Sequence, residues 1–496
     1  MVFGLFKKNV YADVIFKGGK IYTLDPDSPR AEAVACKDGR IIAVGAADDM
    51  EEITGKNTNI IDLAGCSMLP GFIEAYGHPV LQAFNDVCLM LYDDAPRDQV
   101  LENLAEYIKN NPNNRGYLGY GFNTDFVVNK PEDEMRAVLD GVCADKPVAL
   151  LDISGFYGWF NTKAMELVKT VIAEEGEAAP KIITLSYILH ILSPIDFDRL
   201  QRSIVKLAAE YSGKGYTMMF DCGSPDYLHS VYQDMIVEML QSDMLKQRFI
   251  GSFLVVRNVA SDYIVKKLMQ KSTSCAEIEE YVNCRILKLV INANATPNTL
   301  TSTSVTYDLL KILAIQASDR GFNFHIDTIG KEALSETFEA VFLARAAGYK
   351  KNHFVVAHFD SLTQEEKTGL LLDNELCESS STLGDFNKRY SGTEDAKDVM
   401  DAIDKLTMDA AVTLGISDDY GSIENGKRAD FVIFKDDPLD CNLPRFRDLP
   451  ASMTVIGGNI VYEAGTDGYE KWLETLRFRQ ELDENEDEDG EDERIE

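Results

Sequence analysis

Seven short β-like runs alternate with helical stretches along this chain. Val, Ile, Leu and Phe are frequent in most of these runs, which is typical of strands covered on both faces. Such alternation over residues 69–427 predicts an α/β fold, a (β/α)8 TIM-type barrel that is incomplete near strand 8. The predicted strands are residues 71–78, 216–223, 249–256, 285–292, 321–327, 353–359 and 375–382.

The first predicted strand ends in a pattern that suits metal binding. Residues 69–80 read Leu-Pro-Gly-Phe-Ile-Glu-Ala-Tyr-Gly-His-Pro-Val. Alternate residues of a strand point to the same side, so positions 76 and 78 share a face, where two histidines could hold one metal ion. In this chain the pair is Tyr76 and His78.

This motif and both chain ends resemble the amidohydrolase superfamily, whose first barrel strand typically ends in a PGFIDxHxHP-like sequence. Its N-terminal β-domain is similar to ADVIFKGGKIYTLDPDSPRAEAVACKDGRIIAVG at 12–45, and its returning half to GSIENGKRADFVIFKDDPLD at 421–440. Its closing hairpin is similar to MTVIGGNIVYEAG at 453–465. Within the superfamily, GYGFN at 119–123 and PVALLDISGFYGWFNTKAM at 147–165 resemble the N-substituted formamide deformylase-like branch.

The resemblance implies a domain organisation. Residues 1–68 and 428–465 would build a small β-sandwich-like domain beside the barrel domain at 69–427. Residues 79–215 are too long for one crossover helix, so we expect an inserted subdomain there, beside the mouth of the barrel. The last predicted part of the chain is a C-terminal segment at 466–496, which contains a disordered acidic tail.

The resemblance also implies ligands at four strands: His78 ends strand 1, Lys288 lies in strand 4, His325 ends strand 5 and His358 ends strand 6. Imidazoles bind Zn²⁺ well, and a carboxylated lysine could bridge two ions. We therefore expect one or two divalent metal ions, zinc above all, that activate water for attack on a carbonyl carbon. The expected enzyme is a hydrolase of carbon–nitrogen bonds other than peptide bonds, in an amide, formamide or cyclic amide.

Two residues depart from the family pattern or fit it poorly. The phenol of Tyr76 titrates near ~10 and binds Zn²⁺ more weakly than imidazole, so we assign it a catalytic role as an acid or hydrogen-bond donor. The superfamily's strand 8 carries a proton-handling Asp, for which Asp385 in STLGDFNKRY is the best candidate, although its flanks are polar. An alternative rests on Tyr76, Phe156 and the missing strand 8, namely a protein of the same fold that has lost its metal chemistry and binds a small ligand or partner. The hydrolase is the preferred hypothesis, because His78, Lys288, His325 and His358 are all present.

Aromatic residues of the insert are candidates for substrate binding. Phe156 stands where the resembled branch commonly has a substrate-contacting histidine. Together with Trp159 and Tyr120, it could line an aromatic pocket, to which Tyr157 and Phe160 could add. The same rings could equally form the core of the subdomain.

A metal-free nucleophile is a further alternative. Asp221-Cys222 ends strand 2 and His229 follows seven residues later, which could form a nucleophilic pair. His190 and His353 lie outside the strand-end pattern, and we interpret both as structural. The sequence contains no P-loop, no G-x-G-x-x-G and no G-x-S-x-G motif, so phosphate-binding and serine-hydrolase functions lack support.

Charge and composition limit the partners. The net charge is −33, of which the eleven acids and one Arg of residues 481–496 supply −10, so nucleic-acid binding is not expected. That tail either aids solubility or docks on a basic partner. Nine scattered cysteines without a C-x-x-C pair indicate reduced thiols, and no membrane span or signal peptide is evident. We expect a cytoplasmic protein that acts on a small-molecule substrate, does not bind membranes and forms a homo-oligomer.

Overall fold

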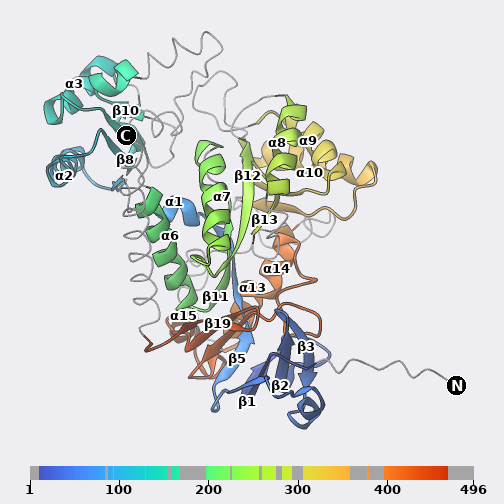
Figure 1. Cartoon of the computed structure of the whole chain (residues 1–496). Helices are drawn as coiled ribbons and strands as arrows, with labels where there is room; N and C mark the ends of the chain where they lie inside the picture. Colours follow the sequence, from blue (N-terminus) through green and yellow to red (C-terminus); the bar gives the residue numbers. More distant parts are fainter. Residues whose placement is uncertain are drawn as a thin grey trace, which may run out of the picture.

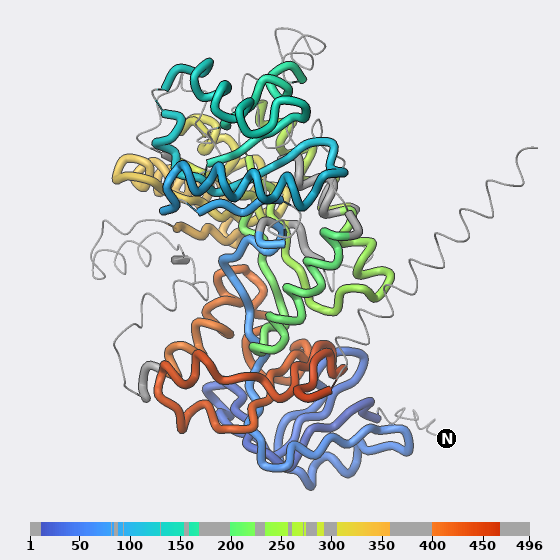
Figure 2. The backbone as a smooth tube through the Cα atoms, turned by 90° about the vertical axis from the view of Figure 1, so that its left-hand side faces the viewer, coloured from blue at the N-terminus to red at the C-terminus, as the bar shows by residue number. Residues whose placement is uncertain are grey.

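The computed structural model describes residues 11–83, 88–92, 94–128, 130–152, 158–167, 197–223, 226–255, 260–274, 282–292, 305–357, 377–378 and 396–466. Three β-sheets with surrounding helices make up this part of the chain. In Figure 1 a sheet built from both chain ends lies at the bottom, the barrel strands lie above it, and the insert lies at the upper left. Figure 2 shows the blue N-terminal and red C-terminal segments side by side at the bottom.

The barrel strands form one parallel sheet, seven strands wide in the described residues. In spatial order they are β16 (Cys377–Glu378), β15 (Phe354–Ala357), β14 (Asn323–Ile329), β13 (Val282–Asn292), β12 (Arg248–Val255), β11 (Tyr216–Asp221) and β6 (Phe72–Gly77). Each lies within or overlaps one of the seven predicted runs, which confirms the parallel α/β arrangement. The sheet curls into a half-barrel, and no strand of the described residues joins β16 to β6, so the closed eight-stranded ring stays a prediction.

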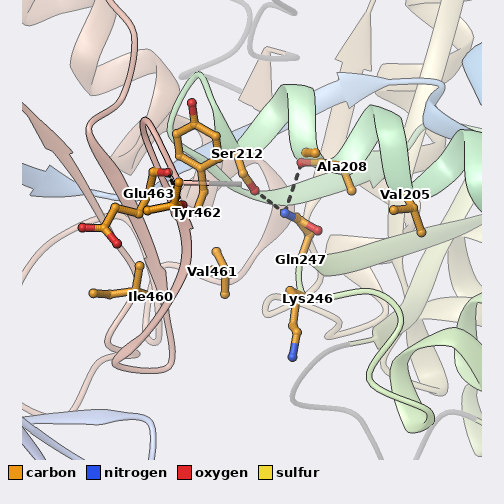
Figure 3. Close-up of a pocket in the computed structure, with 11 residues that line it drawn as sticks. Val205, Ala208, Ser212, Lys246, Gln247, Ile460, Val461, Tyr462 and Glu463 are labelled. Atoms are coloured by element: carbon orange, nitrogen blue, oxygen red, sulfur yellow. Dashed lines mark hydrogen bonds between the residues drawn. The ribbon is translucent and has the colours of Figure 1, made fainter. Parts of the chain in front are cut away.

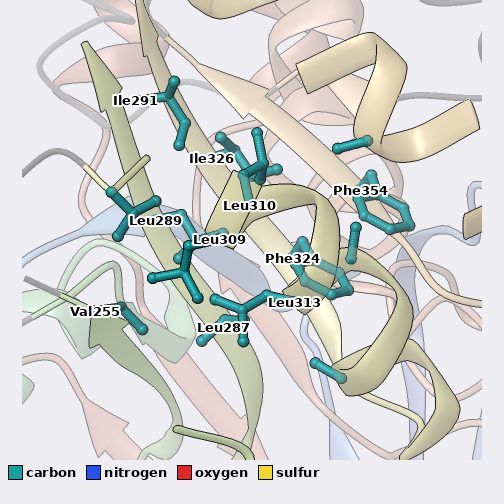
Figure 4. Packing of buried hydrophobic residues seen from close by; sticks show 14 of the residues in the cluster. Val255, Leu287, Leu289, Ile291, Leu309, Leu310, Leu313, Phe324, Ile326 and Phe354 are labelled. Carbon is teal, nitrogen blue, oxygen red and sulfur yellow. The ribbon is translucent and has the colours of Figure 1, made fainter. Parts of the chain in front are cut away.

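Helices cover the outer face of this sheet and connect its strands. They are α6 (Phe197–Ser212), α7 (Asp226–Gln241), α8 (Ser261–Ser274), α9 (Tyr307–Asp319), α10 (Lys331–Ala346), α13 (Ala396–Leu406) and α14 (Met408–Leu414). The side chain of Thr306 caps α9 by accepting a hydrogen bond from the Leu309 backbone N–H. Figure 4 shows Leu309 and Leu313 of α9 beside Leu289 and Leu287 of β13, in the largest apolar cluster of the described residues.

Both chain ends contribute to an eight-stranded sheet. Its strands are β19 (Asn459–Glu463), β18 (Met453–Ile456), β17 (Phe431–Phe434), β5 (Ser67–Pro70), β1 (Val14–Tyr22), β2 (Arg30–Lys37) and β3 (Arg40–Gly45), with β4 (Asn59–Asp62) paired to β1. Pairing of β17 with β5 sets Phe431 opposite Pro70. Short helical turns complete this region: Asp48–Ile53, Pro438–Asp440 and α15 (Leu443–Arg447). That the sheet forms a β-sandwich-like domain of its own stays a prediction.

The insert carries a separate four-stranded sheet. Its elements are α1 (Pro79–Ala83), β7 (Leu89–Met90), α2 (Arg97–Asn110), β8 (Tyr117–Phe122), the turn Thr124–Phe126, α3 (Glu132–Val142), β9 (Val148–Asp152) and β10 (Gly158–Phe160). β8 and β9 are the strands predicted from the GYGFN and PVALLD runs. None of the helices placed in the described residues has the length and apolar content that a membrane crossing requires.

Gly71 alone separates β5 of the eight-stranded sheet from β6 of the barrel. Its backbone N–H donates a hydrogen bond to the Asp430 carbonyl oxygen at 2.9 Å. A Cβ atom at this position would lie 2.4 Å from side-chain atoms of Thr217 on β11. The close approach of β11 therefore requires glycine here, and the chain passes from one sheet to the other without a linker.

A buried ion pair stabilises the same junction between the eight-stranded sheet and the barrel sheet. Arg248, the first residue of β12, donates from Nε and a terminal nitrogen to the two carboxylate oxygens of Asp430 at 2.6 and 2.9 Å. The side chains are 1% and 5% exposed. The Gly457 backbone N–H donates to the same carboxylate at 2.8 Å. This two-pronged geometry stabilises the charges, because each oxygen keeps a donor after losing water.

Arg248→Met should lower the free energy of unfolding by about 3–5 kcal/mol, because it leaves the Asp430 carboxylate buried without its cation. Arg445→Met is the matched control, since Arg445 pairs with Asp436 at a similar 2.7 Å while both side chains are more than half exposed. That change should cost less than about 1 kcal/mol. Urea unfolding of both variants measures the difference, and equal costs would contradict a structural role for the buried pair.

Candidate functional site

Lys288, His325 and Asp327 share the inner face of two neighbouring strands. Leu287 and Leu289 of β13 belong to the cluster under the helices, so Lys288 between them points to the opposite side. The register of β13 and β14 sets Lys288 directly beside His325, and Asp327 follows two residues later on the same face. His325 therefore lies inside β14 and does not end the strand, which corrects the predicted boundary at residue 327.

The Lys288 ammonium is held among polar groups although its side chain is only 2% exposed. Its Nζ donates to Asp327 Oδ1 at 2.5 Å and lies 2.9 Å from His325 Nδ1. Burial lowers the pKa of Lys288, but the Asp327 carboxylate and the Cys222 thiol outweigh burial and raise it above its ordinary value. The lysine is therefore a protonated cation at neutral pH in this arrangement.

Tyr76 and His78 lie at the end of β6, beside these residues. The Tyr76 ring centroid is 5.3 Å from that of His325 and 6.0 Å from that of His78, and Lys288 Nζ lies 5.4 Å from the Tyr76 ring. His78 Nδ1 lies 3.1 Å from the Gly223 carbonyl oxygen, which can only accept a hydrogen bond. The imidazole therefore carries its proton on Nδ1, which leaves Nε2 with a lone pair for a ligand or proton.

Cys222 adds a thiol to the cluster. Its Sγ lies 3.5 Å from His325 Nδ1, and burial raises the pKa of the thiol to about 12. The thiol thus stays protonated at neutral pH, which disfavours its use as a nucleophile. The suggested partner His229 lies in α7, and its side chain is outside the described residues. The structure thus places His325 next to the thiol.

Three predicted site residues lie outside the described residues: His358, Asp385 and Phe156. The structure does not test their roles as metal ligand, proton carrier and substrate contact. The histidine His190 also lies outside. His353 is partly buried, and its backbone N–H donates to Asn323 Oδ1 at 3.0 Å.

The two described aromatic candidates lie in packed surroundings. Trp159 is 1% exposed, its indole N–H donates to the Met135 carbonyl oxygen at 2.6 Å, and its ring meets Phe122 edge-on at 5.9 Å. This position favours the alternative that Trp159 is part of the subdomain core. Tyr120 is half-buried against the apolar cluster that joins the insert to α6. Burial is the main cause that raises the pKa of its phenol, and the nearby Asp152 carboxylate raises it further.

Sequence reasoning missed Asp327. The signal was present, because Asp327 follows His325 by two residues in a predicted strand and must therefore share its inner face. The carboxylate matters chemically, since it balances the charge of Lys288 and is a type of oxygen ligand that divalent metals accept. Asp327 therefore joins His78, His325, Lys288 and Tyr76 in the candidate site.

The donor types of this site fit a divalent metal, but Lys288 occupies a lone pair on two of the donors, His325 Nδ1 and Asp327 Oδ1. Two imidazoles and a carboxylate are common zinc ligands. In the part of the chain that the structure describes, no three His, Cys, Asp or Glu side chains converge tightly enough to hold an ion. An ammonium and a metal ion cannot share the lone pairs of His325 Nδ1 and Asp327 Oδ1, so binding through them requires Lys288 to release them.

A curled parallel α/β sheet with His78, His325 and Lys288 at its strands places this protein in the class of barrel-type α/β folds. The chain belongs to the amidohydrolase family, whose model matches residues 59–369 and 379–462. This confirms the family predicted from the sequence.

Curated relatives cover only part of the chain. The exoenzymes regulatory protein AepA of Pectobacterium carotovorum is 30% identical over 168 residues, which are 33% of this chain and 36% of AepA. The N-substituted formamide deformylase of Arthrobacter pascens is 28% identical over 158 residues, 32% of this chain and 29% of the deformylase. The match thus spans about a third of each relative's length.

Solved structures show the fold over a longer range. An uncharacterized metal-dependent hydrolase from Pyrococcus furiosus has a TM-score of 0.55 at 15% identity, covering 86% of this chain and 99% of that one. A zinc-bound adenosine deaminase from Xanthomonas campestris has a TM-score of 0.51 at 13% identity, covering 95% of this chain and 99% of that one. At these identities the similarity concerns the fold, and it supports a barrel of the predicted type.

Asp327→Asn should lower the free energy of unfolding by about 3 kcal/mol if Lys288 is an ammonium, because the buried cation loses its anion. A carboxylated, anionic Lys288 would give the opposite sign, since Asn would remove a repulsion. A raised folded-state pKa of Lys288 makes the stabilisation fully present below its unfolded pKa of ~10.4 and lost at higher pH.

Asp243→Asn is the matched control for this measurement. Asp243 pairs with Lys246 at the same 2.5 Å, but the two side chains are 77% and 41% exposed. The control should change stability by less than about 1 kcal/mol. Urea unfolding between pH 7 and 11 compares the two variants, and a stabilised Asp327→Asn would rule out the ammonium.

Proposed function

We propose that this protein hydrolyses a carbon–nitrogen bond, other than a peptide bond, in a small amide, formamide or cyclic amide. The observation that carries the proposal is the convergence of His78, Lys288 and His325 on one inner face of an amidohydrolase-family barrel. Matched relatives named a formamide deformylase and a deaminase support C–N chemistry. The substrate is a small molecule that enters at the carboxyl ends of the strands.

A divalent metal, zinc in our proposal, completes the site. His78, His325 and Asp327 would hold it, with His358 as a further ligand and Lys288 as either a released ammonium or, after carboxylation, a ligand. Such a metal, when bound, lowers the pKa of a coordinated water toward ~7 and polarises a carbonyl group. The His78 tautomer suits this role, because its hydrogen bond to Gly223 leaves Nε2 available.

Tyr76 takes a different role from a histidine at its position. A phenol hydroxyl is a hydrogen-bond donor, so Tyr76 can donate to the carbonyl oxygen or leaving nitrogen of the substrate. The Lys288 cation 5.4 Å from its ring favours the developing phenolate if the proton is passed on. Asp385 is our candidate for the remaining proton transfer.

Metal content tests this function. Protein purified without chelators should carry about one equivalent of zinc, iron or manganese by elemental mass spectrometry. His78→Ala and His325→Ala should each lose it, because each removes an imidazole ligand, whereas His353→Ala, outside the site, should keep it. Amide and formamide substrates would then be screened with the loaded protein. Equal metal in all four proteins would contradict the ligand assignment, and no metal after reconstitution would favour the ligand-binding alternative.

A further inference from the structure

Strand β6 departs from the regular alternation of a β-strand. Ile73 and Ala75 belong to an apolar cluster inside the barrel, which reaches the candidate site because the Phe220 ring centroid lies 5.7 Å from that of His325. Strict alternation would turn Tyr76 to the opposite, outer face of the sheet. Instead its ring packs against the same inner cluster, with its centroid 5.3 Å from that of His325. Two consecutive side chains of β6 therefore point inward.

A β-bulge accounts for this departure. In the pairing of β6 with β11, Glu74 lies opposite Met219 and Gly77 lies opposite Asp221. Two residues of β6 thus stand between these pairs against a single residue of β11, which is the arrangement of a bulge. Because the side-chain period of a strand is two, one extra residue moves every later side chain to the other face. The bulge therefore directs the site residues at the end of β6 into the barrel.

The Glu74 side chain bonds to the bulge from the outer face. It is 2% exposed, and its Oε1 accepts a hydrogen bond from the Tyr76 backbone N–H at 3.1 Å. A Cβ atom at Gly77 would lie 2.9 Å from Glu74 Cγ, so the side chain runs along the strand past the glycine. A bulge disrupts the ladder of backbone hydrogen bonds, and a buried N–H needs an acceptor. The carboxylate supplies one at the extra residue.

Helix α6 borders the space around this carboxylate. Burial is the main cause that raises the pKa of Tyr211 on α6, and the Glu74 carboxylate raises it further, so the two side chains are near neighbours. The end of α6 is itself anchored, since Gln247 Nε2 donates to the Ala208 carbonyl oxygen at 3.1 Å and to the Ser212 hydroxyl, as Figure 3 shows. Glu74 thus lies between a strand and an anchored helix, which limits the positions that its carboxylate can take.

We propose that Glu74 is a positioning residue, whose carboxylate stabilises the bulge by binding the Tyr76 backbone N–H and so turns Tyr76 and His78 toward Lys288 and His325. Glu74 lies on the other face of the sheet and touches none of the groups proposed to react. The inference rests on the proposed function for what Tyr76 and His78 do, whereas the orientation of the two side chains can be measured without any activity.

The proton on His78 Nδ1 reports this orientation, because that nitrogen faces the Gly223 carbonyl oxygen at 3.1 Å. The chain has six histidines, so full-length protein labelled with ¹⁵N-histidine gives few NMR signals, and a His78→Gln variant identifies the one of His78. Glu74→Met removes the acceptor at similar side-chain length and should lose the Nδ1–H signal of His78. Glu74→Gln keeps an acceptor oxygen and should retain the signal.

Asn352→Leu is the control for a general loss of stability. Asn352 is 8% exposed and donates to the Ser318 and Phe322 carbonyl oxygens at 3.2 and 2.8 Å, just before β15 begins. Its replacement also removes buried hydrogen bonds, but it should leave the His78 signal unchanged. Urea unfolding of each variant confirms that the labelled proteins are folded.

Loss of the His78 Nδ1–H signal in Glu74→Met alone supports the positioning role. An unchanged signal in Glu74→Met, or an equal loss in Asn352→Leu, overturns it. If Glu74→Met does not fold, Glu74→Gln decides, because a retained signal supports the hydrogen bond and a lost signal overturns it. Wild-type protein without metal or activity would contradict the proposed function and leave this result unaffected.

Discussion

The carboxylate and carbonyl groups of Asp430 join the two large sheets of the molecule. The carbonyl receives the Gly71 N–H where β5 becomes β6, and the carboxylate receives Arg248 at the start of β12. Two barrel strands therefore begin at fixed points on the sheet built from both chain ends. A buried, fully paired carboxylate adds less to net stability than its contacts suggest, because its desolvation is costly, but it tolerates few other geometries. The position of the strand ends that carry Tyr76 depends on it.

Charge balance inside the barrel governs the chemistry of the candidate site. Lys288 is a cation in an apolar sheet, and Asp327 is the anion that makes its burial possible. The same contacts occupy the lone pairs that a metal would use on His325 and Asp327. The Lys288 ammonium and a metal ion would therefore compete for these lone pairs. Carboxylation of Lys288 would remove the ammonium and leave the lone pairs to the metal.

Sequence reasoning identified those parts of the molecule that follow from local periodicity. The alternation of β-like runs with helical stretches predicted seven strands, and the period of two within a strand placed Tyr76 with His78 on one face. The sequence left the role of the aromatic residues open, because aromatic composition does not separate a pocket wall from a core position such as that of Trp159. Sequence reasoning also overlooked Asp327, because the family pattern drew attention to histidines, and it found no eighth strand because polar flanks around Asp385 lack the periodic signal.

The pairing of β5 with β17 has a consequence for biosynthesis. Pro70 lies opposite Phe431, so the first strands leave the ribosome long before their neighbour exists. At ~5–20 residues per second, the intervening stretch takes roughly 20–70 s to synthesise. During that time the β5 edge has unsatisfied backbone groups that can pair with other nascent chains. The sheet whose first strands are made earliest is thus completed last, because β17, β18 and β19 of the same sheet come from residues 431–463.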